Sequence, residues 1–216
     1  MFATGGSPRT DAHMRDALHM AVSLLSAAHG TRDTPAVEHQ HRVAGLAVGI
    51  GRALRLNAAR LEILRLAAMV HDVGKIALPA EILNKPGALT DAEYALIKGH
   101  CLTGFKVLER LGTAWPIAEI AYQHHERMDG SGYPRGLCGA DILLEARILA
   151  VADVYDAMSS NRSYRAGLPR DFVLGELQKM AGRQLDADAV AACRNLVLVS
   201  PESQRDHHPE RNPIRA

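Results

Sequence analysis

Seven histidine and aspartate side chains stand in or beside helical stretches that are otherwise apolar. His39, for example, shares a stripe at helical spacing with Val43 and Ile50, so its imidazole is predicted to point inward. An inward imidazole or carboxylate is costly unless it is hydrogen-bonded, paired or bound to a metal. The full set comprises His39, His71, Asp72, His100, His124, His125 and Asp153.

Each of these side chains, taken alone, has an ordinary explanation as a hydrogen-bonded residue of the core. Taken together, five histidines and two aspartates would each need a separate partner, whereas one metal centre satisfies them all. Imidazole and carboxylate ligands without thiolates favour iron, manganese or zinc over a cysteine-rich structural zinc site. Because seven ligands exceed what one ion takes from a protein, we predict two divalent ions with Asp72 as a bridge. Iron or manganese is expected, with zinc, nickel or magnesium as alternatives.

Further polar residues accompany this set. Lys75 closes the segment HDVGK with a positive charge, and Asp156 follows Asp153 by about one helical turn. We interpret Asp156 as a residue that orients a ligand or a positive side chain, with a plain surface carboxylate as the alternative. Arg162 and Arg165 would share one helix face and could fork onto phosphate oxygens; the alternative is a pair of ordinary solvated arginines.

The segment YQHHERMDGSGYP, residues 122–134, joins the paired histidines to a glycine-rich turn that contains a tyrosine. Glycines let the backbone approach a ligand closely, so this turn is a candidate substrate rim, with a plain turn as the alternative. Glu126 and Arg127 are expected to orient His125 or to pair with each other.

Helices must position these residues, because apolar side chains recur at helical spacing almost throughout and no alternating strand-like stretch stands out. Start signals include Thr34-Pro35, Asn57 and a capping box formed by Thr90 and Glu93. We therefore expect an all-α bundle of about seven to nine helices with the metal centre in its core. The expected helices span residues 11–28, 34–54, 57–71, 90–97, 116–124, 143–158, 169–180 and 186–198, and the continuation beyond residue 98 is left open.

Composition narrows the class of protein. The 216 residues are 47% hydrophobic but only 4% aromatic, so aliphatic side chains must fill the core. A net charge of +1 gives no basic excess for a nucleic-acid duplex or an anionic membrane surface. The sequence contains no run of about 18 apolar residues and no signal-peptide pattern. Three scattered cysteines fit a reducing compartment, so a cytoplasmic protein is expected.

The ordered motifs EHQHRVA, HDVGK, HHERMDGSGYP and ARILAVADVYDAMSSNRSYR resemble those of the HD-GYP family, a branch of the HD-domain metal-dependent phosphohydrolases. The two residues HD alone would be a weak match, but the complete ordered set is specific. It spans about residues 30 to 190 of the chain. The resemblance implies hydrolysis of cyclic di-GMP to the linear dinucleotide pGpG, and often onward to GMP.

The resemblance also implies two metal positions that share one carboxylate. The first would be held by His39, His71, Asp72 and Asp153, and the second by Asp72, His100, His124 and His125. Three cationic side chains would contact the substrate phosphates, namely Lys75, Arg162 and Arg165. Tyr133 would lie at the guanine-binding edge.

The implied chemistry is attack by a metal-bridging hydroxide on phosphorus, because two ions roughly 3.5–4 Å apart lower the pKa of a shared water. Asp72, as the bridge, and Lys75, which offsets charge on the phosphoryl oxygens, would be the catalytic residues. Some family members hold a third metal through a glutamate four residues before the first histidine. Pro35 stands at that position here, so two metals are expected.

Two other functions of the same fold compete with this one. The chain could be a catalytically weak cyclic dinucleotide-binding effector or interaction module, or an enzyme of another HD type, such as a nucleotide monoester hydrolase. Proteins that synthesise cyclic di-GMP (GGDEF proteins) are partners by resemblance only. Residues 1–30 are expected to form an N-terminal helix with a flexible end, 31–199 the catalytic domain and 200–216 a flexible polar tail. Whether the chain is a stand-alone enzyme or a piece of a longer sensor protein stays open.

Overall fold

The computed structural model describes residues 8–30, 34–83, 85, 87–161 and 166–199, and every structural statement below concerns these residues. This part of the chain is all-α, as expected, and contains no strand beyond two isolated β-bridges. Nine of its α-helices have seven residues or more, within the expected number, and α4 is a single turn. The helices are α1 (Pro8–Gly30), α2 (Thr34–Ala53), α3 (Ala58–Val70), α4 (Ala80–Leu83), α5 (Asp91–Lys98), α6 (His100–Glu109), α7 (Ile117–Gln123), α8 (Leu144–Ser159), α9 (Arg170–Met180) and α10 (Ala187–Val199), with 3₁₀ turns η1 (Val73–Ala77) and η2 (Gly139–Asp141).

Two of the predicted start signals operate as expected. Asn57 accepts a hydrogen bond from the backbone N–H of Arg60, and Thr90 forms a reciprocal capping box with Glu93. The sequence misplaced the start of the first helix, because α1 begins at Pro8 rather than at residue 11. The expected polar tail, residues 200–216, lies outside the described residues.

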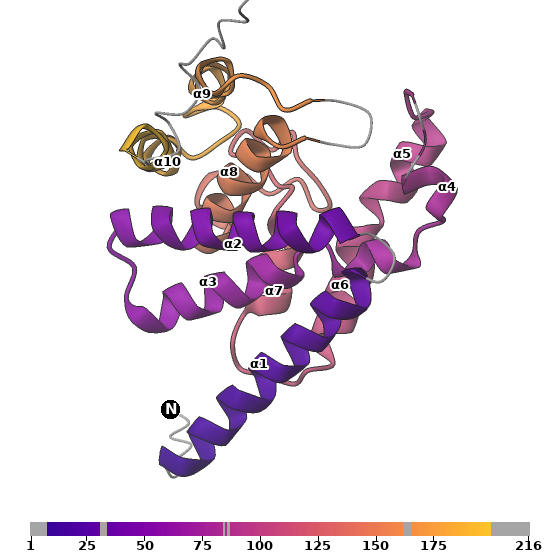
Figure 1. Ribbon diagram of the computed structural model, residues 1–216. Helices are drawn as coiled ribbons and strands as arrows, with labels where there is room; N and C mark the ends of the chain where they lie inside the picture. Colours follow the sequence, from indigo (N-terminus) through magenta and orange to yellow (C-terminus); the bar gives the residue numbers. More distant parts are fainter. Residues whose placement is uncertain (1–7, 31–33, 84, 86, 162–165, 200–216) are drawn as a thin grey trace, which may run out of the picture.

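The core forms where α2 packs between α3 and α8 (Figure 1). The predicted stripe of α2 is buried there, with Val43, Ala47 and Ile50 all fully inaccessible to solvent. Among the described residues, the buried apolar side chains are Leu, Ile, Val, Ala, Met and Cys, without any aromatic. This confirms that aliphatic packing supplies the core, as the low aromatic content predicts. None of the helices in the described ranges is both long and apolar enough to cross a bilayer.

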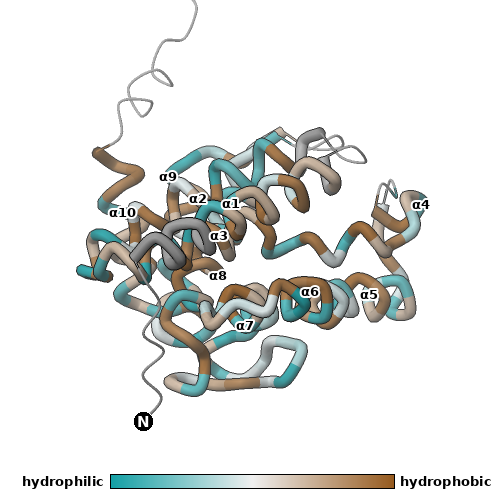
Figure 2. Tube along the Cα trace, turned by 90° about the horizontal axis from the view of Figure 1, so that it is seen from below, coloured by the Kyte–Doolittle hydropathy of each residue, from teal (hydrophilic) through white to brown (hydrophobic). Residues whose placement is uncertain are grey.

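A close backbone contact between η1 and α6 sets the distance between two segments that carry candidate ligands. A Cβ atom added at Gly74 would lie 2.0 Å from the carbonyl oxygen of His100 and 2.6 Å from the amide nitrogen of Gly104. Only a residue without a side chain allows this approach. In the view of Figure 2, α5 and α6 follow one another along one side of the molecule, with α7 beside α6.

Gly74→Ala should therefore lower the free energy of unfolding by about 2 kcal/mol or more, because the added methyl group cannot fit without moving α6. Gly45→Ala is the matched control on α2, where an added Cβ meets no heavy atom within 4 Å. There the helix should gain about 0.5–1 kcal/mol. Urea unfolding of both variants measures the difference, and equal stabilities would contradict the contact.

Candidate metal centre

All seven predicted ligand side chains lie in one region, at the facing parts of five helices. His39 lies on α2, and His71 is the C-terminal cap of α3, with Asp72 directly after it. His100 is the first residue of α6, and Asp153 lies within α8. The paired histidines follow α7, with His124 as its C-terminal cap. Together with the sulfur of Cys101, their ligand atoms form three groups, and within each group all ligand atoms lie within 4.8 Å of one another. The groups are His39, His71 and Asp153; His71, Asp72 and His124; and His100, Cys101, His124 and His125.

Three of the imidazoles are held by the same local contact. In each, Nδ1 donates to the backbone carbonyl oxygen three residues earlier, at 2.6–2.7 Å; the pairs are His71 with Ala68, His100 with Ile97 and His124 with Ala121. Because a carbonyl oxygen only accepts, each Nδ1 must carry the hydrogen. The lone pair is then on Nε2, which is the arrangement that a metal ligand requires.

Unpaired buried atoms gather at this place. His71 Nε2, Asp72 Oδ1 and His124 Nε2 are buried without a hydrogen-bond partner, and Gln40 Nε2 is the one other such side-chain atom in the described ranges. An unsatisfied buried polar atom costs about 1–3 kcal/mol. With the hydrogens on Nδ1, all three atoms of the centre are acceptors, so they cannot pair with one another. A cation satisfies all three, and the residues present therefore fit a metal.

The two oxygens of Asp72 face different imidazoles. Oδ2 lies 3.4 Å from His71 Nε2, whereas Oδ1 lies 3.3 Å from His100 Nε2 and 3.8 Å from His124 Nε2. Lys75 Nζ donates to Oδ2 at 2.6 Å. Burial favours the neutral acid, but Lys75 and the nearby histidines outweigh it and hold the pKa of Asp72 well below its ordinary value. An ionised carboxylate thus stands between two groups of ring nitrogens, as a bridge must.

His39 lies between two carboxylates. Its Nδ1 is 2.7 Å from Asp156 Oδ2 and its Nε2 is 3.3 Å from Asp153 Oδ1. Burial lowers the pKa of His39, but the hydrogen bonds to Asp153 and Asp156 outweigh this and raise the pKa to about 9. Arg42, which sequence reasoning missed, forks onto Asp156 at 2.6 and 3.0 Å. Its position three residues after His39 on the same helix face was the available signal.

The paired histidines differ from His39 in their electrostatics. Burial is the main cause that lowers the pKa of His125 to about 3 and that of His124 well below its ordinary value. Neighbouring histidines add to the effect on His124. Both rings are therefore neutral over the physiological range and keep a lone pair for an ion.

The glycine-rich segment is fixed over the centre by Glu126. This carboxylate is 2% exposed and accepts the backbone N–H groups of Arg135 at 2.7 Å and Leu137 at 3.0 Å. Tyr133 stacks on the ring of His125, with centroids 4.7 Å apart. The expectation that Glu126 orients His125 or pairs with Arg127 was wrong, because Glu126 binds the loop backbone instead. Arg127 donates to backbone carbonyls.

Two further residues near Tyr133 gave no signal in the sequence. Tyr94 on α5 meets Tyr133 edge to face, with centroids 6.5 Å apart. The ammonium of Lys98 lies 5.2 Å from the Tyr94 ring centre and 5.9 Å from that of Tyr133. The packing of α5 against the loop brings them together, and helical spacing cannot reveal such a contact. Arg162 and Arg165 lie outside the described residues.

Metal binding should release a proton from His39 at pH 7.5, because its pKa of about 9 keeps it protonated while His125 is already neutral. Affinity for Mn²⁺ should rise from pH 7 and level off near 9. In the metal-free protein, the same raised pKa stabilises the fold fully below 6.5, and this is lost as the pH rises through 9. Calorimetric titration in buffers of different ionisation enthalpy counts the proton. Asp156→Asn should reduce the number of protons released. Mn²⁺ binding with an affinity independent of pH would contradict the assignment of the proton to His39.

Comparison with known proteins places this geometry in a family. A protein-family model described as the HD domain matches residues 25–189, which is more than half of the chain. The chain is 38% identical over 181 residues to a cyclic di-GMP phosphodiesterase of Thermotoga maritima, covering 82% of this chain and 49% of that protein. It is 37% identical over 164 residues to the 3′3′-cGAMP-specific phosphodiesterase 3 of Vibrio cholerae, covering 76% and 36%. The chain thus spans about half the length, or less, of these curated relatives.

A solved structure shows the same fold. An HDG"Y"P protein from Bdellovibrio bacteriovorus aligns with a TM-score of 0.65 at 18% identity, covering 85% of this chain and 62% of that one. At this identity the likeness concerns the fold alone. The family model matches most of this chain, and the HD and GYP segments meet at one buried centre. The chain therefore belongs to the HD-domain family, in its HD-GYP branch.

Proposed function

We propose that this chain is a metal-dependent phosphodiesterase that opens a cyclic dinucleotide, with cyclic di-GMP as substrate and pGpG as its first product. The observation that carries the proposal is the group of unpaired buried acceptors on His71, Asp72 and His124. A domain that used these residues only for packing would bury three unsatisfied polar atoms with no interaction to offset their cost. The names of the relatives supply the substrate class.

The division of Asp72 between two sets of imidazoles supports two ions rather than one. His39, His71 and Asp153 with Asp72 Oδ2 would hold the first ion, and His100, His124 and His125 with Asp72 Oδ1 the second. When bound, such ions supply Lewis-acid charge and a water of lowered pKa. Imidazole and carboxylate ligands suit iron or manganese. The expectation of no third ion stays a prediction, since the side chain of Pro35 lies outside the described residues.

The protein's own groups have separate tasks in this proposal. Asp72 stays ionised and would give one oxygen to each ion. The ammonium of Lys75 lies at the edge of the centre, where it donates to Asp72. A phosphate oxygen of the substrate can replace Asp72 as the acceptor, and the ammonium then offsets the negative charge on that oxygen. Asp156, fixed by Arg42, holds His39 in orientation. Arg162 and Arg165 remain proposed phosphate contacts.

The loop beside the paired histidines would form the rim for a base. Glu126 fixes its backbone, and Tyr133 covers His125 with a half-buried ring. Because the face of Tyr133 that stacks on His125 is occupied, we propose that Tyr133 contacts guanine with its remaining surface, next to Tyr94. GGDEF proteins as partners and a cytoplasmic location stay predictions.

His39→Gln should lower kcat/KM for cyclic di-GMP by at least about 10²-fold, because it removes an inward ligand. His41→Gln is the matched control, since His41 lies two residues away on α2 but is exposed. Its activity should match the unaltered protein. Circular dichroism checks that both variants keep their helices, and equal loss in both, or in neither, would remove His39 from the centre.

A direct assay should resolve the substrate. Mn²⁺- or Fe²⁺-loaded protein is incubated with cyclic di-GMP and, separately, with 3′3′-cGAMP, and linear dinucleotide and mononucleotide are separated by chromatography. We expect pGpG to appear first and chelation to stop its formation. The second substrate is included because relatives of 35–42% identity carry it in their names. Faster turnover of 3′3′-cGAMP would reassign the specificity, and binding without product would favour the effector function.

A further inference from the structure

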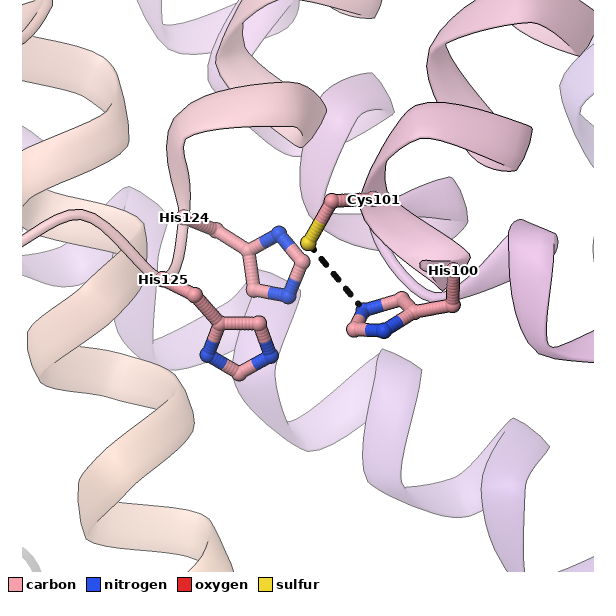
Figure 3. Close-up of side chains that lie close together, drawn as sticks. All are labelled: His100, Cys101, His124 and His125. Atoms are coloured by element: carbon pink, nitrogen blue, oxygen red, sulfur yellow. Dashed lines mark hydrogen bonds between the residues drawn. The ribbon is translucent and has the colours of Figure 1, made fainter. Parts of the chain in front are cut away.

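Cys101 adds a thiol to the group of imidazoles at the second metal position. It is the second residue of α6 and is 1% exposed. Its Sγ lies 3.6 Å from His100 Nε2, and the ligand atoms of His100, Cys101, His124 and His125 all lie within 4.8 Å of one another. Figure 3 shows the sulfur directed at the His100 ring, with the two rings that follow α7 alongside.

A second observation points to a ligand in this group. His124 is fully buried, its Nδ1 donates to a backbone carbonyl, and its Nε2 has no partner. His100 Nδ1 is committed to a carbonyl in the same way, so its Nε2 also offers a lone pair. In the absence of an ion, the Cys101 S–H can only donate to that lone pair. The group therefore contains more acceptors than donors.

The distance between sulfur and nitrogen fits shared coordination. Zinc lies about 2.3 Å from thiolate sulfur and about 2.0–2.1 Å from imidazole nitrogen, and a tetrahedral angle between them gives an S···N distance of about 3.6 Å. The distance of 3.6 Å between Cys101 Sγ and His100 Nε2 matches this edge. Three imidazoles and one thiolate are ligand types that zinc accepts, and zinc can expand beyond four ligands to include Asp72 Oδ1.

We propose that Cys101 is a ligand of the second metal position, where its thiolate joins His100, His124 and His125 and selects zinc over manganese. Binding breaks the S–H bond, releases the proton to water and forms a metal–sulfur bond, since a coordinating thiol is deprotonated. Thiolate is a soft ligand that zinc accepts readily and manganese does not. The first position keeps only imidazole and carboxylate. The inference rests on the metal centre proposed above, but not on the identity of the substrate.

Cobalt reports thiolate ligation directly. The unaltered protein loaded with Co²⁺ should show a near-ultraviolet band for charge transfer from sulfur to metal, and Cys101→Ser should lose it. Cys193→Ser is the matched control, because Cys193 is equally buried on α10 but belongs to no ligand group in the described part of the chain. It should keep the band. Circular dichroism and thermal unfolding of Cys101→Ser and Cys101→Ala show whether the fold is retained.

A competition experiment measures the selectivity. The protein is equilibrated with equal Zn²⁺ and Mn²⁺, and bound metal is counted by mass spectrometry. The ratio of bound zinc to manganese should fall at least about tenfold in Cys101→Ser and stay unchanged in Cys193→Ser. A band missing from the unaltered protein, or unchanged in Cys101→Ser, overturns the inference.

The two proposals fail in different ways. Turnover of cyclic di-GMP by Co²⁺-loaded protein without a thiolate band would leave the phosphodiesterase standing and remove Cys101 from the site. A Cys101-dependent band in a protein that hydrolyses no cyclic dinucleotide would keep the ligand and refute the function. No bound Co²⁺ at all would overturn both.

Discussion

The structure depends on one buried carboxylate. Asp72 is 5% exposed and ionised, and its two oxygens face imidazoles that come from different helices. A charge in such a place is stable only if positive charge surrounds it. Lys75 supplies one part of that charge, and the unpaired nitrogens of His71 and His124 offer lone pairs to a cation. The helices are therefore arranged around an ionised carboxylate and unpaired acceptors that fit a cation.

The positions of three imidazoles follow from the ends of helices. The last carbonyls of a helix have no partner inside it, and the carbonyls near the ends of α3, α5 and α7 accept the Nδ1 hydrogens of His71, His100 and His124. One contact thus satisfies a free carbonyl and selects the tautomer that leaves Nε2 available. The approach of η1 to α6 at Gly74 then fixes how far His100 stands from Asp72. Local backbone geometry, rather than long side chains, gives the centre its precision.

The loop and the thiol make contacts that the ligand motifs do not reveal. Glu126 lies directly after the paired histidines, yet its carboxylate binds the backbone on the far side of the GYP turn. It links the candidate metal centre to the turn that carries Tyr133. Cys101 lies directly after His100 and directs its sulfur into the same group of nitrogens. The absence of thiolates was assumed when iron and manganese were favoured from the sequence, and the geometry of Cys101 opens that assumption to experiment.

The sequence by itself determined the all-α fold, most helix boundaries and the set of inward histidines and aspartates. It could do so because apolar spacing, capping residues and motif order are local properties of the chain, as the Asn57 cap and the buried stripe of Val43 and Ile50 show. Only the tertiary structure decided which oxygen of Asp72 faces which imidazole, that Arg42 holds Asp156, and that Glu126 clamps the loop. Contacts between distant helices and loops depend on how whole elements pack. The spacing of residues along the chain does not determine the distance between a candidate ligand and a residue of another helix or loop.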